Sequence, residues 1–413
     1  MFVLWYRCRT GAGALERWLD MTDTVLVDDL RVIDTDTHVS EPPDLWTSRV
    51  PAKWRDQVPH VEVNPATGYE HWRIGDSWLM GTGFYAVAGW KEFPPNTPRQ
   101  LQDDGVDQGS WNAKERLQRM DEYGIWGQVL YPNLIGFESP LFMRLGPEIS
   151  LACVVAYNDF IVEFASADPK RFIPIAMVPF WDQDAAVAEM ARARDIGHRG
   201  ILFANKYEMV DLPAFTDPHW DTIYAAAQDL ELSVNFHVGF SSSTNGAATA
   251  MTQLLANFEP RAAARGTSLG LMSNADSIAA IVTSGLCDRF PRLKFVSVES
   301  GFGYITYLLE SLDWVWQGYG AHLQSPMLPS EYFRRQCYGT FWFERKTLPL
   351  LETYPDNFMF ETDYPHPTSM SPGPASPAEL PREHIAKYFA DVPPEITRKV
   401  MHGNAAAVYG LDR

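Results

Sequence analysis

The sequence predicts an α/β fold, a (β/α)8 TIM barrel with a long insertion after the first strand. The chain has 413 residues, of which 46% are hydrophobic, and this is enough for one large core. Apolar runs recur along the chain with amphipathic segments between them, as expected for strands that alternate with helices. Polar residues suited to chemistry follow several of the runs, where a barrel carries its active site.

Eight apolar runs are the candidate strands. Several are continuous rather than alternating, which is typical of parallel strands that are covered on both faces. The runs are 32–38, 127–131, 172–180, 200–205, 232–238, 294–300, 338–343 and 357–364. Amphipathic segments predict helices at 113–122, 149–167, 184–196, 220–230, 275–287 and 304–316.

We expect residues 1–31 to be an N-terminal extension and residues 32–413 to form a single barrel domain. Residues 39–112, rich in aromatic residues and in Pro and Gly turns, are the insertion, and predict a small β subdomain or a lid. The polar segment 239–267 predicts a loop beside the site, and residues 381–413 predict closing helices.

The net charge of −18 argues against binding to nucleic acid or to an anionic membrane surface. No apolar run has the length of a membrane span. The four cysteines are far apart and form no CxxC pair, which favours a reduced, cytoplasmic protein without a disulfide framework or a structural zinc site.

The first strand carries the strongest functional signal. Asp34, Asp36 and His38 alternate along it, so their side chains point to the same side. Two carboxylates and an imidazole are costly to bury together unless a cation neutralises them. The sequence therefore predicts a divalent metal at the barrel mouth, close to His237 and Asp363 at the ends of later strands.

Five short segments together resemble the amidohydrolase superfamily, in particular the branch that contains aminocarboxymuconate semialdehyde decarboxylase and related aromatic-acid decarboxylases. The segments occur in the order typical of that branch and span the chain from the first strand to the C-terminus. They are Val-Ile-Asp-Thr-Asp-Thr-His at 32–38, Asn-Phe-His-Val-Gly at 235–239, Val-Glu-Ser-Gly at 298–301, Glu-Thr-Asp-Tyr-Pro-His at 361–366 and Gly-Asn-Ala-Ala at 403–406.

The resemblance implies a set of metal ligands. The branch has a metal-binding His-x-His on its first strand, and this chain has Asp36-x-His38 there. The metal-binding histidine of the fifth strand corresponds to His237. The metal-binding aspartate of the eighth strand, which also acts as a base, corresponds to Asp363. Glu299 stands where the branch commonly has a catalytic histidine, and the resemblance also implies a homodimer.

Mixed carboxylate and imidazole ligands suit zinc, which we expect first, and also manganese or iron(II). A metal with an open position lowers the pKa of bound water to about 7 and polarises carbonyl oxygens. Asp363 and Glu299 are then the candidate proton carriers, and His366 is a third catalytic candidate. Structural roles stay open: Asp34 fits a buried carboxylate below the metal, and Asp36 and His38 could form only a hydrogen-bonded pair.

Three enzymatic functions and one non-enzymatic function fit these residues. The first prediction is a metal-dependent hydrolase, in which activated water attacks a carbonyl-type centre of a small aromatic or hydrophobic substrate. The alternative is a non-oxidative metal-dependent decarboxylase of an aromatic or unsaturated acid. A non-heme iron oxygenase is the third. The fourth is a barrel that only binds small molecules without catalysis, and it does not explain why the set of metal-binding residues is complete.

Overall fold

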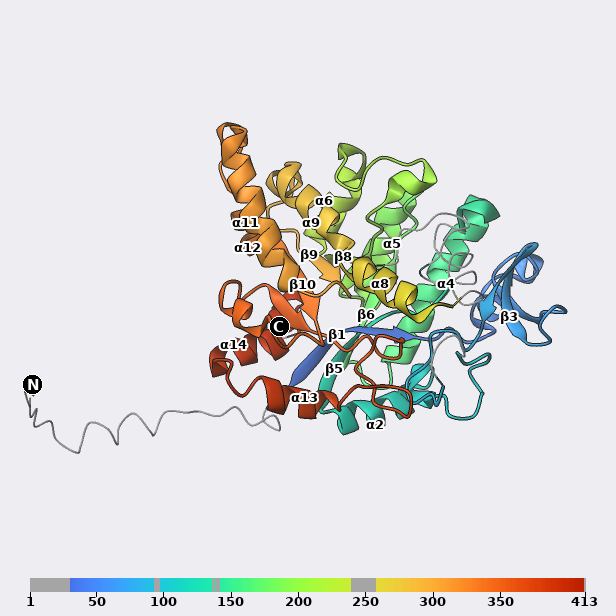
Figure 1. Cartoon of the computed structure of the whole chain (residues 1–413). Coiled ribbons are helices and arrows are strands. Elements are labelled where there is room, and N and C mark those ends of the chain that lie inside the picture. Colours follow the sequence, from blue (N-terminus) through green and yellow to red (C-terminus); the bar gives the residue numbers. More distant parts are fainter. Residues whose placement is uncertain (1–29, 93–96, 136, 138–141, 239–257, 412–413) are drawn as a thin grey trace, which may run out of the picture.

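The structure is a computed structural model that describes residues 30–92, 97–135, 137, 142–238 and 258–411 (Figure 1). Nearly all of the expected N-terminal extension, and residues 239–257 of the loop predicted at 239–267, lie outside the described residues. None of the described helices is long and apolar enough to cross a membrane.

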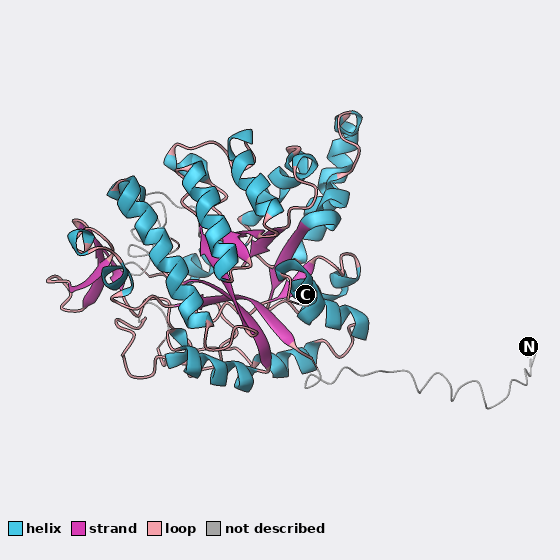
Figure 2. Cartoon of the chain, turned by 180° about the vertical axis from the view of Figure 1, so that it is seen from behind, coloured by secondary structure: helices cyan, strands magenta, loops and turns pink. Residues whose placement is uncertain are grey.

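Eight parallel strands follow one another around a barrel, which confirms the predicted (β/α)8 fold (Figures 1 and 2). The barrel closes where the main chain of His38 donates to the carbonyl of Tyr364 at 2.7 Å. In spatial order the strands are β1 (Val32–Val39), β5 (Ile125–Pro132), β6 (Phe172–Met177), β7 (Gly200–Leu202), β8 (Ser233–His237), β9 (Phe295–Val298), β10 (Cys337–Phe341) and β11 (Phe358–Phe360).

Helices cover the outside of the barrel (Figure 2). Five of them correspond to predicted helices: α2 (Ala113–Tyr123), α4 (Pro147–Ala165), α5 (Gln183–Ile196), α6 (Asp221–Asp229) and α11 (Gly303–Gly318). The others between the strands are α8 (Pro260–Leu271), α9 (Asn274–Thr283), α10 (Leu286–Arg289) and α12 (Pro329–Gln336). The chain closes with α13 (Pro381–Tyr388), α14 (Pro394–Arg398) and α15 (Asn404–Tyr409).

Several predicted elements are wrong in extent. The strands expected at 172–180 and 200–205 end at Met177 and Leu202. The helix expected at 275–287 is two helices, because Gly285 has φ +78° and a left-handed residue ends a helix. The strand expected at 357–364 ends at Phe360. Three residues later Asp363 has φ +57°, which is incompatible with an extended strand and turns the chain toward the barrel axis.

The insertion contains α1 (Leu45–Arg49) and a three-stranded antiparallel sheet of β2 (His60–Val63), β3 (Glu70–Ile74) and β4 (Ser77–Gly81). The sheet lies outside the barrel, beside α4 (Figure 1). Buried Trp46 connects the sheet to α4. Its ring packs edge-on against that of Trp72 in β3, with the ring centroids 5.4 Å apart, and its indole N–H donates to the carbonyl of Cys153 in α4 at 3.1 Å.

Arg116 of α2 is fully buried and ties the end of the insertion to the first strand. Its guanidinium donates to the carbonyl of Gly109 at 2.5 Å, to the carbonyl of His38 at 2.6 Å and to the Gln128 side chain at 3.2 Å. A buried guanidinium that donates to two backbone carbonyls and one side chain holds all three acceptors in place at once. The main chain of His38 is therefore held from outside the barrel as well as by its neighbouring strands.

Candidate metal centre

The six residues predicted for the site meet at the carboxyl ends of the strands. β1 brings Asp36 and His38, β8 ends at His237, and Glu299 directly follows β9. Asp363 and His366 lie in the turn after β11. All of these side chains are buried except that of Glu299, which is 13% exposed.

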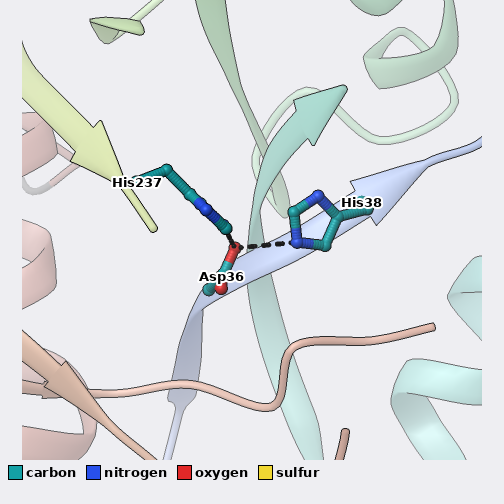
Figure 3. A group of neighbouring side chains, drawn as sticks. All are labelled: Asp36, His38 and His237. Carbon is teal, nitrogen blue, oxygen red and sulfur yellow. Dashed lines mark hydrogen bonds and ion pairs between the residues drawn. The ribbon is translucent and has the colours of Figure 1, made fainter. Parts of the chain in front are cut away.

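Two carboxylate oxygens form the centre of the cluster. Asp36 Oδ1 lies 3.3 Å from His38 Nε2 and 3.3 Å from His237 Nε2, so that one oxygen faces two imidazoles (Figure 3). Asp363 Oδ1 lies 3.2 Å from His38 Nε2 and 2.9 Å from His366 Nδ1. Nitrogen and oxygen atoms from three strand ends thus point into one small volume.

Backbone carbonyls fix which imidazole nitrogens carry the protons. His38 Nδ1 donates to the carbonyl of Pro132 at 2.8 Å, and His237 Nδ1 donates to the carbonyl of Val238 at 2.6 Å. In the neutral ring the Nε2 atoms of both histidines then present lone pairs to the carboxylates. This is how proteins orient histidines that bind a metal.

The orientation of the His366 ring is also fixed by a hydrogen bond, here to the side chain of Asn133 rather than to a backbone carbonyl. The Asn133 amide donates to the carbonyl of Phe84 at 3.1 Å, so its oxygen faces His366 Nε2, also at 3.1 Å. Burial, and then the charge of His38, lowers the pKa of His366 to about 4. The neutral ring donates from Nε2 and turns the Nδ1 lone pair toward Asp363. The His366 ring also stacks on the His38 ring, with the two centroids 3.6 Å apart.

This arrangement requires positive charge between the side chains. Among the described residues, Asp36 Oδ2, His38 Nε2 and Asp363 Oδ1 are buried without a hydrogen-bond partner. Burial lowers the pKa of His38, but the Asp36 and Asp363 carboxylates outweigh burial and raise it to about 10. A proton on His38 supplies one charge; a divalent cation supplies two and satisfies all the inward lone pairs. The donor set fits a metal.

Glu299 lies beside this cluster in surroundings that favour its protonated form. Burial, and then the charges of Asp363 and Asp36, raises its pKa well above the usual range. The hydroxyl of Thr368 lies 2.5 Å from Asp363 Oδ2 and 3.3 Å from Glu299 Oε1. The hydroxyl has a single proton to donate, and Asp363 is the nearer of these two acceptors.

The backbone at two of these residues is strained. Glu299 has φ +54° and Asp363 has φ +57°, and non-glycine residues in this region cost about 1–3 kcal/mol each. Such strain persists only where surrounding contacts hold it, and it is concentrated at active sites. Here the main chain of Asp363 donates to the carbonyl of Asp36 at 3.0 Å, which holds the two acidic residues together.

Asp34 lies one step deeper along β1 and has the structural role that the sequence favoured. It accepts hydrogen bonds from the main chain of Thr362 at 2.8 Å, from the Thr362 hydroxyl at 2.6 Å and from Gln128 at 3.1 Å. Burial raises the pKa of Asp34 to about 7. Its oxygens are thereby occupied with joining β1 to β5 and to the turn that carries Asp363.

Four residues near the site had no readable signal in the sequence. Asn133 and Thr368 lie in turns after strands, and their roles depend on distant partners. Tyr85 of the insertion packs against His366 with ring centroids 5.0 Å apart, and Phe137 lies 4.8 Å from the His237 ring. Both rings are half-buried, so they line the approach to the histidines.

Known proteins are similar to this chain over most of its length. Gamma-resorcylate decarboxylase from Polaromonas sp. strain JS666 is 22% identical over 369 residues, which cover 83% of this chain and 98% of that protein. A solved amidohydrolase from Mycobacterium avium subsp. paratuberculosis K-10 aligns with a TM-score of 0.68 and 21% identity, covering 92% of this chain and 98% of the other.

A third protein is a dihydroxybenzoic acid decarboxylase from Polaromonas sp. JS666, solved with manganese and the inhibitor 2-nitroresorcinol. It aligns with a TM-score of 0.55 and 19% identity over 93% of this chain and 98% of its own. Two of these three proteins are named as decarboxylases. The amidohydrolase family model matches residues 147–411, more than half of the chain, and the protein therefore belongs to the amidohydrolase family.

Proposed function

We propose that this amidohydrolase is a non-oxidative, metal-dependent decarboxylase of a small aromatic acid. The partial burial of Glu299, which favours its protonated form, carries the proposal, because decarboxylation must deliver a proton to carbon whereas hydrolysis needs a base. From the sequence alone, a carboxylate on the sixth strand suggested a base. Burial reverses that inference, since it favours the protonated form of Glu299.

Asp36, His38, His237 and Asp363 would hold the metal, and His366 Nδ1 offers a fifth donor. Zinc and manganese both suit these ligands, and the manganese in the dihydroxybenzoic acid decarboxylase supports a divalent ion. When bound, the cation would draw electron density from oxygens of the substrate.

The reaction at the substrate consumes one proton. The proton adds to the ring carbon that bears the carboxylate, the bond from that carbon to the carboxylate breaks, and its electron pair returns to the ring as CO2 leaves. We assign the proton to Glu299, which is 13% exposed and therefore open to the site. Thr368 holds the Glu299 carboxyl beside Asp363.

Two aromatic side chains support an aromatic substrate. Tyr85 and Phe137 lie over the imidazoles of His366 and His237, respectively, and offer flat apolar walls next to the charged cluster. Among the described residues, no lysine or arginine forms an ion pair with Asp36, Glu299 or Asp363.

The test is an assay of CO2 release from hydroxylated benzoic acids, including gamma-resorcylate, by protein loaded with manganese or zinc. We expect at least one acid to be converted to the phenol with one CO2 per turnover, and the Glu299→Gln variant to lose this activity. Glu352→Gln, which neutralises an exposed glutamate, is the matched control. Hydrolysis of aryl esters or amides without CO2 release from any acid would contradict the proposal.

A further inference from the structure

A large cavity opens at the end of the barrel opposite the metal centre. Its volume is about 820 Å³, which is within the range of small-molecule sites. Residues just before β1, β6, β7 and β9 line it, together with Tyr409 at the end of α15. It is therefore built from the amino ends of the strands.

The cavity is strongly basic in a chain with a net charge of −18. Among the described residues, six of the chain's 34 lysines and arginines line it, against one lining carboxylate, Glu231. The six are Arg31, Lys170, Arg194, Arg199, Arg292 and Lys294. Such a concentration of one charge in a concave surface attracts ions of the other charge.

Arg194 and Arg199 form the least compensated part of this cavity. Both are half-buried; Arg194 donates to the carbonyl of Leu230 at 3.1 Å, and neither forms an ion pair with a carboxylate of the described residues. Burial, and then the charge of Arg194, lowers the pKa of Arg199. Arg292, by contrast, pairs with Asp229 at 3.3 Å.

From this cluster we infer that the cavity is a binding site for a small polyanion that carries more than one phosphate group. Guanidinium groups match the paired oxygens of a phosphate, and four of them line this cavity together with two lysines, enough for more than one phosphate. The volume accommodates a phosphorylated sugar or a nucleotide.

Tyr409 separates this site from the metal centre. Its hydroxyl donates to Asn235 Oδ1 at 3.0 Å, and Tyr131 donates to the same oxygen from the other side, also at 3.0 Å. All three side chains are buried in the barrel interior. An anion in the cavity would therefore touch none of the metal-ligating side chains, and its binding can be measured without substrate.

The probe is fructose 1,6-bisphosphate, added to the full-length protein at constant ionic strength, with fructose as the uncharged control. We expect the bisphosphate to raise the midpoint of thermal unfolding by ~2 °C or more. Calorimetry should show the Arg199→Met variant binding it at least ~10-fold more weakly. Arg55→Met, which removes an exposed charge from the insertion, should bind as the wild type does.

The variant also reports on folding. Because Arg199→Met removes one of two adjacent like charges, it should unfold at the same or a higher temperature than the wild type when no anion is present. Loss of binding in a stable variant would then support the site. Equal binding by the wild type and Arg199→Met, or an equal shift with sodium sulfate at the same ionic strength, would overturn it.

Discussion

The two ends of the barrel concentrate opposite charges and compensate them in different ways. At the carboxyl ends of the strands, acidic side chains and imidazoles are buried. Hydrogen bonds to backbone carbonyls fix the orientation of the His38 and His237 imidazoles. At the amino ends, arginines and lysines are half-buried or exposed, and several have no acidic partner among the described residues. The first arrangement fits a resident cation; the second fits an anion that exchanges with solvent.

The difference shows that burial decides whether a cluster of like charges needs a resident counter-ion or can be stabilised by water until a ligand binds. Water can stabilise Arg194 and Arg199 when no ligand is bound, because neither is fully buried. No water-exposed surface is left to Asp36 or Asp363, so they need a counter-charge as part of the folded protein. Predictions that remove one element at a time test this contrast.

Removing a central carboxylate should have the largest effect. Asp36→Ala takes away the oxygen that faces both His38 and His237, and we expect metal affinity to fall by more than ~100-fold, with CO2 release abolished. Equilibrium dialysis against manganese measures the affinity. An Asp36→Ala protein that binds manganese normally would place the metal elsewhere.

Glu299→Gln should separate chemistry from metal binding. If Glu299 supplies the proton, kcat should fall ~10²- to 10⁴-fold while the metal content stays that of the wild type. Steady-state kinetics and elemental analysis of the same preparation check both halves. A variant with wild-type kcat would remove Glu299 from the mechanism.

The pH profile should carry the signature of the same group. The pKa of Glu299 is raised, so the active, protonated form is present at low pH and is lost as pH rises through that pKa. The wild type should therefore lose kcat on the alkaline side. The residual activity of Glu299→Gln should lack this limb, since an amide does not titrate there. An unchanged alkaline limb in the variant would assign it to another group.

Arg116→Met should destabilise the protein without removing a ligand. The carbonyls of Gly109 and His38 lose their buried donor, and we expect a loss of about 2–4 kcal/mol in the free energy of unfolding. Lys399→Met is the control, because the exposed ion pair of Lys399 with Asp356 should contribute less than ~1 kcal/mol. Chemical denaturation compares the two. Equal losses would mean that Arg116 does not hold the insertion to β1.

The smallest effect is expected at Asn133. Asn133→Leu leaves His366 Nε2 without its acceptor and frees the ring to turn, which should weaken manganese binding ~10- to 100-fold at most. A loss as large as that of Asp36→Ala would make His366 a principal ligand. No loss would limit His366 to packing on His38.

The barrel and the grouping of the six site residues could both be predicted from the sequence, because both follow from local rules of strand geometry. A strand period of two puts Asp36 and His38 on one side, and parallel strands bring His237, Glu299 and Asp363 to one edge. The raised pKa of Glu299 could not be predicted, since it depends on burial and on Asp363, which is 64 positions away. The same holds for Asn133, Thr368 and Arg116, whose partners are set by tertiary packing.

The metal content of the purified protein tests the central claim most directly. Mass spectrometry on protein prepared without a metal-affinity tag should find close to one zinc or manganese per chain in the wild type. Asp36→Ala should lose it, and His219→Ala, a change in a histidine outside the cluster, should keep it. Wild-type protein that stays free of metal after manganese or zinc is supplied, with Asp36→Ala equally stable, would contradict the account.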